Sequence, residues 1–230
     1  MAYIGKSVIG VEHPATSALT ATSGTFTGNV STTPGSVSIK AINGGYTGGL
    51  LIEDDGNTTK SAITHVVGTM AISANASADH MLITADGEVT MPVQPCFQVN
   101  NSSAQNNIPT STLTTVVFNQ EVIDKGGNFA SNTFTAPVTG SYFLGLKINS
   151  ASLDDGANYF QVRISTSNRN YDFFIDPDFG QDAVLWTFHT TMVADMDASD
   201  TAIGQVYQAG GTAQTDLRAS ECQFFGYLIA

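Results

Sequence analysis

The sequence predicts an all-β protein, and three observations lead to that prediction. No stretch places apolar residues at positions i, i+3, i+4 and i+7, so we expect no long helix. Short runs alternate between apolar and polar residues instead, which is the period of a strand with one face against a core. Asp-Gly and Gly-Gly pairs separate several of these runs, and such pairs favour tight turns between strands.

Residues 1–36 show neither a strand nor a helix pattern. A short apolar start is followed by a stretch rich in Ser, Thr and Gly, which is typical of linkers and short turns. The start lacks the features of a secretory signal, and no run in the chain is long enough to span a membrane. We therefore expect a leader and linker, on a protein that is made in the cytoplasm and has no membrane insertion.

Residues 37–92 form a second region, made of brief β-type runs. The last run continues through Asp86-Gly87 to Pro92, as expected of a hairpin that ends at a domain boundary. The runs cover residues 37–42, 50–52, 63–67, 70–72 and 81–83.

The first 92 residues are poor in aromatic side chains, which are only Tyr3, Phe26 and Tyr46. A segment of this length with so few large side chains buries too little apolar surface to close a core alone. We therefore expect residues 37–92 to trimerise, with the short strands of three chains intertwined around a shared axis.

Residues 93–230 hold most of the aromatic residues and are expected to form the main core. The clearest signal is the run Phe134 to Tyr142, which reads Phe-Thr-Ala-Pro-Val-Thr-Gly-Ser-Tyr. Pro137 cannot donate to a strand ladder and Gly140 relaxes the backbone, so the run predicts two strands that meet at a corner. The second strand then has apolar residues at alternate positions, namely Tyr142, Leu144, Leu146 and Ile148.

This corner resembles a segment of the globular heads of the complement subunit q family, which share the jelly roll of the tumour-necrosis-factor-like proteins. The resemblance extends to Phe97, to Gly126-Gly127-Asn128-Phe129 and to the closing Phe224-Phe225-Gly226-Tyr227-Leu228. It implies a ten-strand jelly-roll sandwich over residues 93–230, packed as a homotrimer about a threefold axis.

Two further motifs resemble bacteriophage virion proteins. Ala-Tyr-Ile-Gly-Lys-Ser, at residues 2–7, looks like the first residues of many tail-fibre proteins. Residues 83–97 look like the joint that precedes the head domains of such proteins. Together they imply that the jelly roll is carried on a virion and that the N-terminus attaches to other virion proteins.

The last strand predicts a contact with a neighbouring chain, because both of its faces are apolar. Phe224 and Leu228 fall on one face, and Phe225, Tyr227 and Ile229 fall on the other. A lone sandwich normally keeps one face of such a strand polar. The second apolar face needs a neighbour, and the resembled jelly rolls are trimers, so we expect Phe225, Tyr227 and Ile229 to lie in the trimer interface.

The charge balance excludes some partners. A net charge of -12 with only eight Lys and Arg argues against binding nucleic acid or an anionic membrane. Cys96 and Cys222 are expected as thiols in a protein folded in the cytoplasm. The resembled fold places the first and last strands side by side, which leaves a Cys96–Cys222 bridge open.

No catalytic motif is present, and we expect a protein that is not an enzyme. His189 alternates with apolar residues rather than with a carboxylate, and no nucleophile elbow, phosphate loop or zinc-binding histidine pair occurs. A glycan-cleaving spike is the enzymatic alternative. Its paired carboxylates would come from Asp172, Asp176, Asp178 and Asp182.

No cofactor is expected, with calcium as the open alternative. Asp195, Asp197 and Asp200 supply carboxylates at close spacing, although the glycine and glutamate of an EF-hand loop are missing. A solvated turn before the strand at 203–207 explains the same residues.

A recognition surface is expected in the loop region from Asn168 to Gln181, where aromatic and polar residues mix in a way suited to stacking on sugars. The residues expected to bind a receptor are Asn168, Arg169, Asn170, Tyr171, Asp176, Asp178 and Phe179.

These features lead to one main functional hypothesis: a trimeric short tail fibre or spike, a structural virion protein whose head binds a host surface glycan or protein. A capsid decoration protein or head fibre is the alternative of the same class. The receptor, and attachment to the tail or the capsid, stay open.

Overall fold

The computed structural model describes residues 47–53, 60–66, 68–73 and 80–230. The chain divides after Ile42, and its second unit, Asn43–Ala230, holds all of the described residues. The expected leader and linker at residues 1–36, and the predicted run at 37–42, lie outside the described residues. None of the described residues forms a helix, as the absence of helical periodicity predicted.

The first sheet is an antiparallel meander of five short strands, in the order β1-β2-β3-β4-β5. The predicted runs at 50–52, 70–72 and 81–83 fall within strands of this sheet, and the run predicted at 63–67 matches the strand that ends at Val66. Asp86-Gly87 forms the expected turn of the β4–β5 hairpin, where Gly87 has φ 93°. The bounds are β1 Thr47–Glu53, β2 Lys60–Val66, β3 Thr69–Ser73, β4 Met81–Ile83 and β5 Val89–Thr90. Its intertwining between chains stays a prediction.

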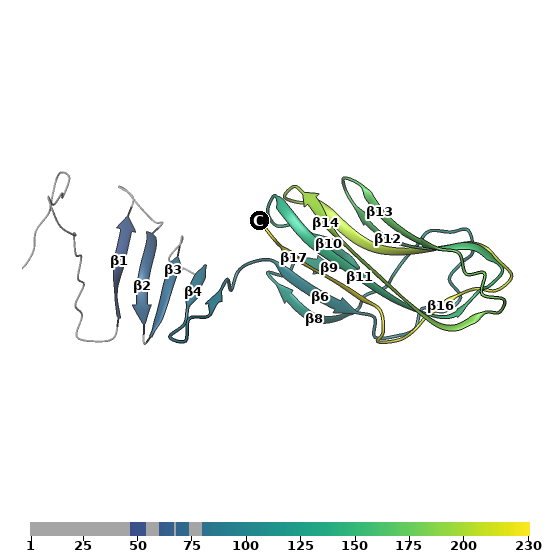
Figure 1. The fold of residues 1–230 in the computed structure, drawn as a ribbon. Coiled ribbons are helices and arrows are strands. Elements are labelled where there is room, and N and C mark those ends of the chain that lie inside the picture. The colour runs from purple at the N-terminus through teal and green to yellow at the C-terminus, as the bar shows by residue number, and fades with distance from the viewer. Residues whose placement is uncertain (1–46, 54–59, 67, 74–79) are drawn as a thin grey trace, which may run out of the picture. The chain divides into compact units, whose positions relative to one another are not determined.

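The head is a sandwich of two sheets (Figure 1). One sheet has the strand order β14-β11-β17-β6-β8, with β16 pairing at the side of β11; the other has the order β13-β12-β15-β10-β9, with β7 pairing at the side of β15. The bounds are β6 Cys96–Asn100, β7 Thr114–Thr115, β8 Gln120–Lys125, β9 Phe129–Ala130, β10 Thr133–Thr135, β11 Gly140–Leu153, β12 Ala157–Thr166, β13 Asn170–Ile175, β14 Ala183–Met196, β15 Thr201–Gly210, β16 Asp216–Leu217 and β17 Gln223–Leu228.

The chain crosses between the two sheets repeatedly, as in a jelly roll. It passes from β8 to β9, from β10 to β11 and from β11 to β12, and each step changes the sheet. Two paths of five strands confirm the expected ten-strand sandwich. The predicted corner is the β10–β11 crossing, and it is held from inside, because the Tyr142 hydroxyl donates a 2.7 Å hydrogen bond to the Val138 carbonyl oxygen.

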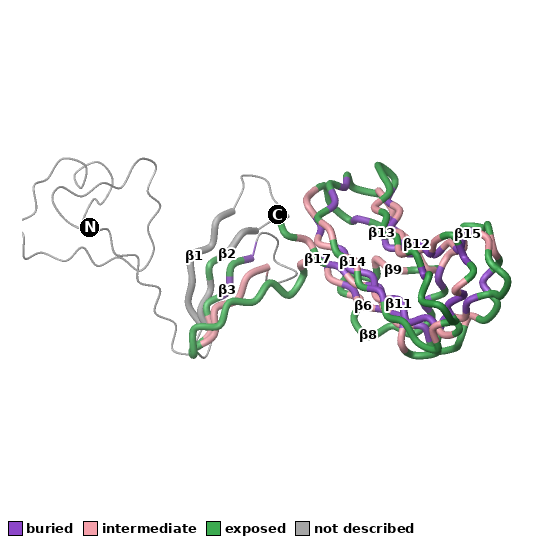
Figure 2. The backbone as a smooth tube through the Cα atoms, turned by 45° about the vertical axis from the view of Figure 1, so that its right-hand side comes forward, coloured by how far each residue is buried: buried purple, intermediate pink, exposed green. Residues whose placement is uncertain are grey.

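The core lies between the two sheets and follows the predicted alternation. Tyr142, Leu144, Leu146 and Ile148 of β11 are all buried, as are Phe160, Val162 and Ile164 of β12. Phe97, Phe134 and Phe224 form a packed aromatic group, with 4.4 Å between the ring centroids of Phe97 and Phe134. Figure 2 shows buried residues alternating with more exposed ones along these strands.

At the end of the head where β11 turns into β12, one buried carboxylate joins two loops. Asp154 is 1% exposed, and its oxygens accept hydrogen bonds from the backbone N–H groups of Gly156, Thr212 and Ala213. Burial raises the pKa of Asp154, but these backbone donors outweigh burial and leave the pKa below its ordinary value. The charged carboxylate therefore holds the β11–β12 turn against the loop at 211–215.

Asp154→Asn should destabilise the full-length protein by about 3 kcal/mol at pH 7, because an amide cannot accept all of these bonds and the donors stay buried. Urea unfolding followed by tryptophan fluorescence measures this loss. Asp178→Asn is the matched control, since that side chain is exposed.

The lowered pKa of Asp154 predicts that the contribution of this residue to stability depends on pH. A carboxyl group whose pKa is lowered on folding stabilises the protein above the unfolded pKa, and this contribution is lost as pH falls through the folded pKa. The stability difference between wild type and Asp154→Asn should therefore narrow in acid below the ordinary aspartate range. A difference that stays constant down to the lowest pH would contradict the role of the charge.

Candidate functional site

The outward face of β17 is apolar, as predicted. The Tyr227 ring lies 5.3 Å from the Phe143 ring of β11, and the Phe225 ring lies 6.4 Å from it, measured between centroids. Phe225 can lie flat against the sheet because its cross-strand partner is Gly145, where any Cβ would collide with the ring. The three rings form one aromatic surface, here called the last-strand face.

The last-strand face continues onto neighbouring strands. Val193 of β14 pairs with Phe143 and is 57% exposed, while Tyr227 is 46% and Ile229 is 47% exposed. The structure thus places Phe225 and Tyr227 on one face, as the sequence predicted, and adds Phe143 and Val193. Ile229 lies one residue beyond β17 and lines the adjoining pocket with Tyr227. Their place in a trimer interface stays a prediction. Alternation along β11 turns Phe143 away from the core, but its neighbours across the sheet follow only from the pairing.

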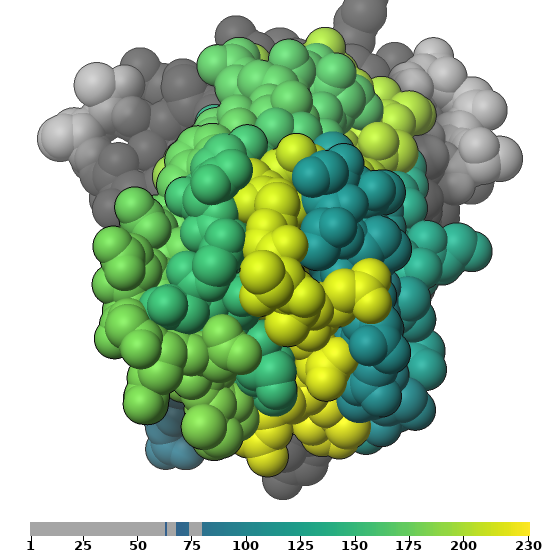
Figure 3. Space-filling model, turned by 90° about the vertical axis from the view of Figure 1, so that its right-hand side faces the viewer, coloured from purple at the N-terminus to yellow at the C-terminus, as the bar shows by residue number. Residues whose placement is uncertain are grey.

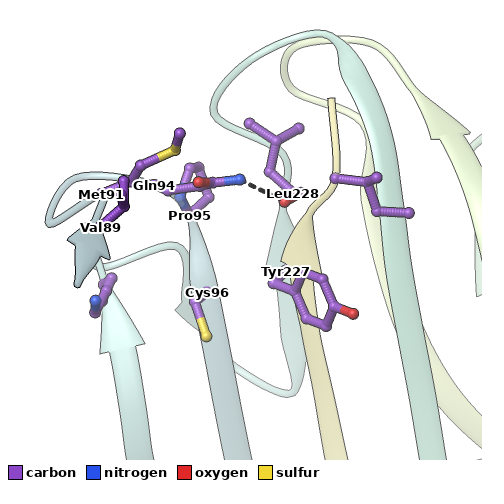
Figure 4. Close-up of a pocket in the computed structure, with 9 residues that line it drawn as sticks. Val89, Met91, Gln94, Pro95, Cys96, Tyr227 and Leu228 are labelled. Carbon is purple, nitrogen blue, oxygen red and sulfur yellow. Dashed lines mark hydrogen bonds between the residues drawn. The ribbon is translucent and has the colours of Figure 1, made fainter. Parts of the chain in front are cut away.

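A pocket of about 470 Å³ adjoins the last-strand face (Figure 4). Its lining comes from the end of β17, from residues 89–96, which lead into the head, and from Lys125 of β8. Gln94 fixes one wall, because its side-chain amide donates a 2.6 Å hydrogen bond to the Leu228 carbonyl oxygen. The Leu228 N–H in turn donates to the Pro95 carbonyl oxygen at 3.1 Å. Five of the lining residues belong to the motif at residues 83–97, although nothing in the sequence predicted a pocket there.

The two cysteines are free thiols. Cys96 pairs with Tyr227 across the ladder and lines the pocket, whereas Cys222 is fully buried. Burial raises the pKa of the Cys222 thiol, so this thiol stays protonated and inert. Although β6 and β17 are neighbours, as the resemblance implied, the cysteines do not form a bridge.

The expected recognition loop from Asn168 to Gln181 is not a single loop, and this prediction is corrected. Residues Asn170–Ile175 form β13, an edge strand that pairs with β12. Asn168 and Arg169 lie in the turn before β13, and Asp176, Asp178 and Phe179 lie in the loop after it. Alternation then turns Tyr171 toward the core, against which it packs. The predicted residues therefore divide between the two ends of one strand.

At the end of β13 that leads to β14, the loop is held to the β11–β12 turn. The Phe179 N–H donates to Asp155 Oδ1 at 2.7 Å, and the Asp155 N–H donates to Asp182 Oδ1 at 3.0 Å. The Phe179 ring stacks on Trp186 with 4.9 Å between centroids. Figure 3 views the head from this end, where segments from the early (blue), middle (green) and late (yellow) parts of the head meet.

At the other end of β13, the acidic residues form a turn. Asp200 Oδ2 accepts hydrogen bonds from the Asp197 N–H and from the Asn168 side-chain amide, both at 2.8 Å. Asn168 also donates to the Asp195 carbonyl oxygen. Among residues 80–230 and the strands described before them, no group of three or more Asp, Glu, His or Cys side chains is placed to hold a metal ion. Calcium at Asp195, Asp197 and Asp200 stays a prediction.

Three of the four carboxylates of the enzymatic alternative have structural partners. Asp172 accepts hydrogen bonds from Arg163 and Gln161, and the Arg163 guanidinium is the main cause that lowers its pKa. Asp176 accepts from the Asp178 N–H, and Asp182 from the Asp155 N–H. His189 is exposed and lies opposite Lys147 rather than a carboxylate.

The described part of the chain contains no helix long and apolar enough to cross a membrane.

Comparisons with known proteins show no family for this chain. No family model matches the sequence, and no curated protein matches it. Solved structures that resemble the chain include the globular domain of zebrafish complement 1qA protein, at 20% identity and a TM-score of 0.45, covering 60% of this chain and 98% of that chain. Murine APRIL is similar at 12% identity and a TM-score of 0.44, covering 59% of this chain and 99% of its own. The strand order of the head itself defines it as a jelly roll.

Proposed function

We propose that this protein is a non-enzymatic bacteriophage virion protein, a homotrimeric short tail fibre or spike whose head binds the host surface. The observation that carries the proposal is the last-strand face. Phe143, Phe225 and Tyr227 form an apolar surface around a tightly paired central strand, in a chain that is otherwise strongly acidic. Such a surface on a soluble protein marks a contact with another protein.

A second and a third copy are the partners that this proposal assigns to the last-strand face. Cyclic symmetry closes the assembly and removes the apolar surface of every copy at once. It also displays three identical sets of outer loops and strands at fixed spacing. Three weak sites on one rigid head hold a cell surface more strongly than one site, without any new contact.

Attachment to a virion is supported by the two short sequence motifs at residues 2–7 and 83–97. The proposed function is adhesion rather than turnover, because three of the four candidate carboxylates, those of Asp172, Asp176 and Asp182, are engaged in hydrogen bonds that hold loops and strands.

The purified full-length protein should have a mass of about three times 24.1 kDa in light scattering after gel filtration. Tyr227→Asp and Phe225→Asp should each shift it to 24.1 kDa, since three carboxylates cannot be buried together near one axis. Val138→Asp is the control, because Val138 is similarly exposed but lies at the β10–β11 corner. A wild-type monomer at tens of micromolar would refute the trimer.

Fluorescently labelled full-length protein should adhere to cells in a panel of bacterial strains and release no reducing sugar from them. The monomeric Tyr227→Asp variant should adhere at least about tenfold more weakly, because avidity is lost. Release of reducing ends that stops in Asp172→Asn or Asp182→Asn would favour the glycan-cleaving alternative.

A chelator should leave adhesion and the melting temperature unchanged, because Asp200 is already held by the Asp197 N–H and by Asn168. A clear drop in the melting temperature with EDTA that calcium restores would reinstate the metal site.

A further inference from the structure

The outer face of the sheet β13-β12-β15 carries an aromatic and polar cluster, and of its residues only Asp172 and Phe174 fall within the recognition region expected from the sequence. Phe160, Val162 and Ile164 of β12 are buried in the core, so the residues between them point away from it. Cross-strand pairing places Gln161 between Phe174 and Tyr207, and places Arg163 between Asp172 and Gln205. The face is therefore built by the consecutive strands β12 and β13 together with β15, which follows later in the sequence.

Three aromatic rings on this face form a platform, here called the Tyr159 platform and consisting of Tyr159, Phe174 and Tyr207. The Tyr159 and Tyr207 rings are stacked, with 5.8 Å between centroids and an interplanar angle of 28°. Phe174 packs edge-on against Tyr159 at 5.5 Å and is itself 54% exposed. The rings support one another, yet a large part of Phe174 has no protein contact.

A rigid polar group borders the platform. Arg163 donates from Nε and Nη2 to the two oxygens of Asp172, and Gln161 donates to Asp172 Oδ1 at 2.7 Å. Gln161 is 5% exposed, and the side chains of Arg163 and Asp172 are 20% and 26% exposed. The guanidinium is thus held in one orientation, and its charge is balanced by a neighbour.

Free hydrogen-bonding groups remain around the rings. Among the described residues, the hydroxyl groups of Tyr159 and Tyr207 make no hydrogen bond, and neither does Nη1 of Arg163. Flat aromatic surface beside fixed donors is the combination that binds a pyranose ring, whose C–H face is apolar and whose rim carries hydroxyl groups.

We propose that the Tyr159 platform is a glycan-binding site for neutral hexose units, with Arg163 and the two tyrosine hydroxyls donating to sugar oxygens. The proposal rests on the proposed function, since it names the ligand class of the same adhesive head. The charge balance selects a neutral sugar: Arg163 is already paired with Asp172, and the net charge of -12 repels polyanions.

The location fits the proposed trimer. The last-strand face and the Tyr159 platform lie on the outward sides of opposite sheets of the sandwich. Burial of the first face between protomers leaves the second on the outside, where a polysaccharide has access to it.

Affinity gel electrophoresis of the full-length protein tests the site, with dextran, yeast mannan or β-1,4-galactan as neutral polymers and polygalacturonate as the anionic one. At least one neutral polymer should retard the protein, and polygalacturonate should not. Phe174→Ala and Tyr159→Ala should each weaken retardation at least about tenfold, because the stacking surface is lost.

Two conservative variants isolate the polar contribution. Tyr207→Phe keeps the ring and the packing but removes one hydroxyl, and Arg163→Lys keeps the charge but loses the fixed planar donor. Each should weaken retardation several-fold with an unchanged melting temperature and oligomeric mass. Leu185→Ala is the control, because Leu185 is 52% exposed on an edge strand of the other sheet.

Adhesion to whole cells separates this inference from the proposed function. If Phe174→Ala and Tyr159→Ala lose both polymer binding and adhesion, both stand. The platform is not the glycan site if no neutral polymer retards the protein, if only polygalacturonate does, or if these variants bind the polymers as wild type does. Adhesion of the wild-type protein to cells would still support the proposed function in each of these cases. Wild-type protein that adheres to no strain would overturn the proposed function, whatever the polymers show.

Discussion

The head depends on the burial of one whole face of β11. This strand pairs with β14 on one side and with β17 and β16 on the other, and its inward residues from Tyr142 to Ile148 are sealed in the core. Because side chains alternate, this burial also dictates what points outward, namely Phe143, Gly145 and Lys147. A slip of one residue would exchange the two sets, so the register that builds the core also creates the apolar surface beside β17.

Local patterns predicted the parts of this fold that depend on local chemistry. Alternation identified the buried face of β11, Asp86-Gly87 identified a hairpin, and Pro137 with Gly140 identified the corner between sheets. The error at β13 has a physical cause. Asn170 and Asp172 are polar because they face outward on an edge strand, and beside the turn residues that flank them they resembled one long loop.

Pairings between distant segments could not be predicted in this way. Tyr159 and Tyr207 meet only because β12 and β15 are neighbours, and Asp154 reaches Thr212 and Ala213 across a gap of more than fifty residues. Neither contact leaves a periodic signal, since each depends on a single residue placed by the ladder around it. The roles of residues that hold loops together or form a surface platform are therefore visible in the structure but not in the sequence.

The way the chain enters the head has a mechanical consequence. Residues Cys96–Asn100 run antiparallel to β17 along their whole length, while Pro95 and Ser141 are bonded to the end of the chain at Leu228, Ile229 and Ala230. Tension between residue 95 and the opposite end of the head acts along β6, parallel to both of its neighbouring strands. The ladder bonds then share the load in shear instead of opening one after another, so the strand that tethers the head is also placed to resist its removal.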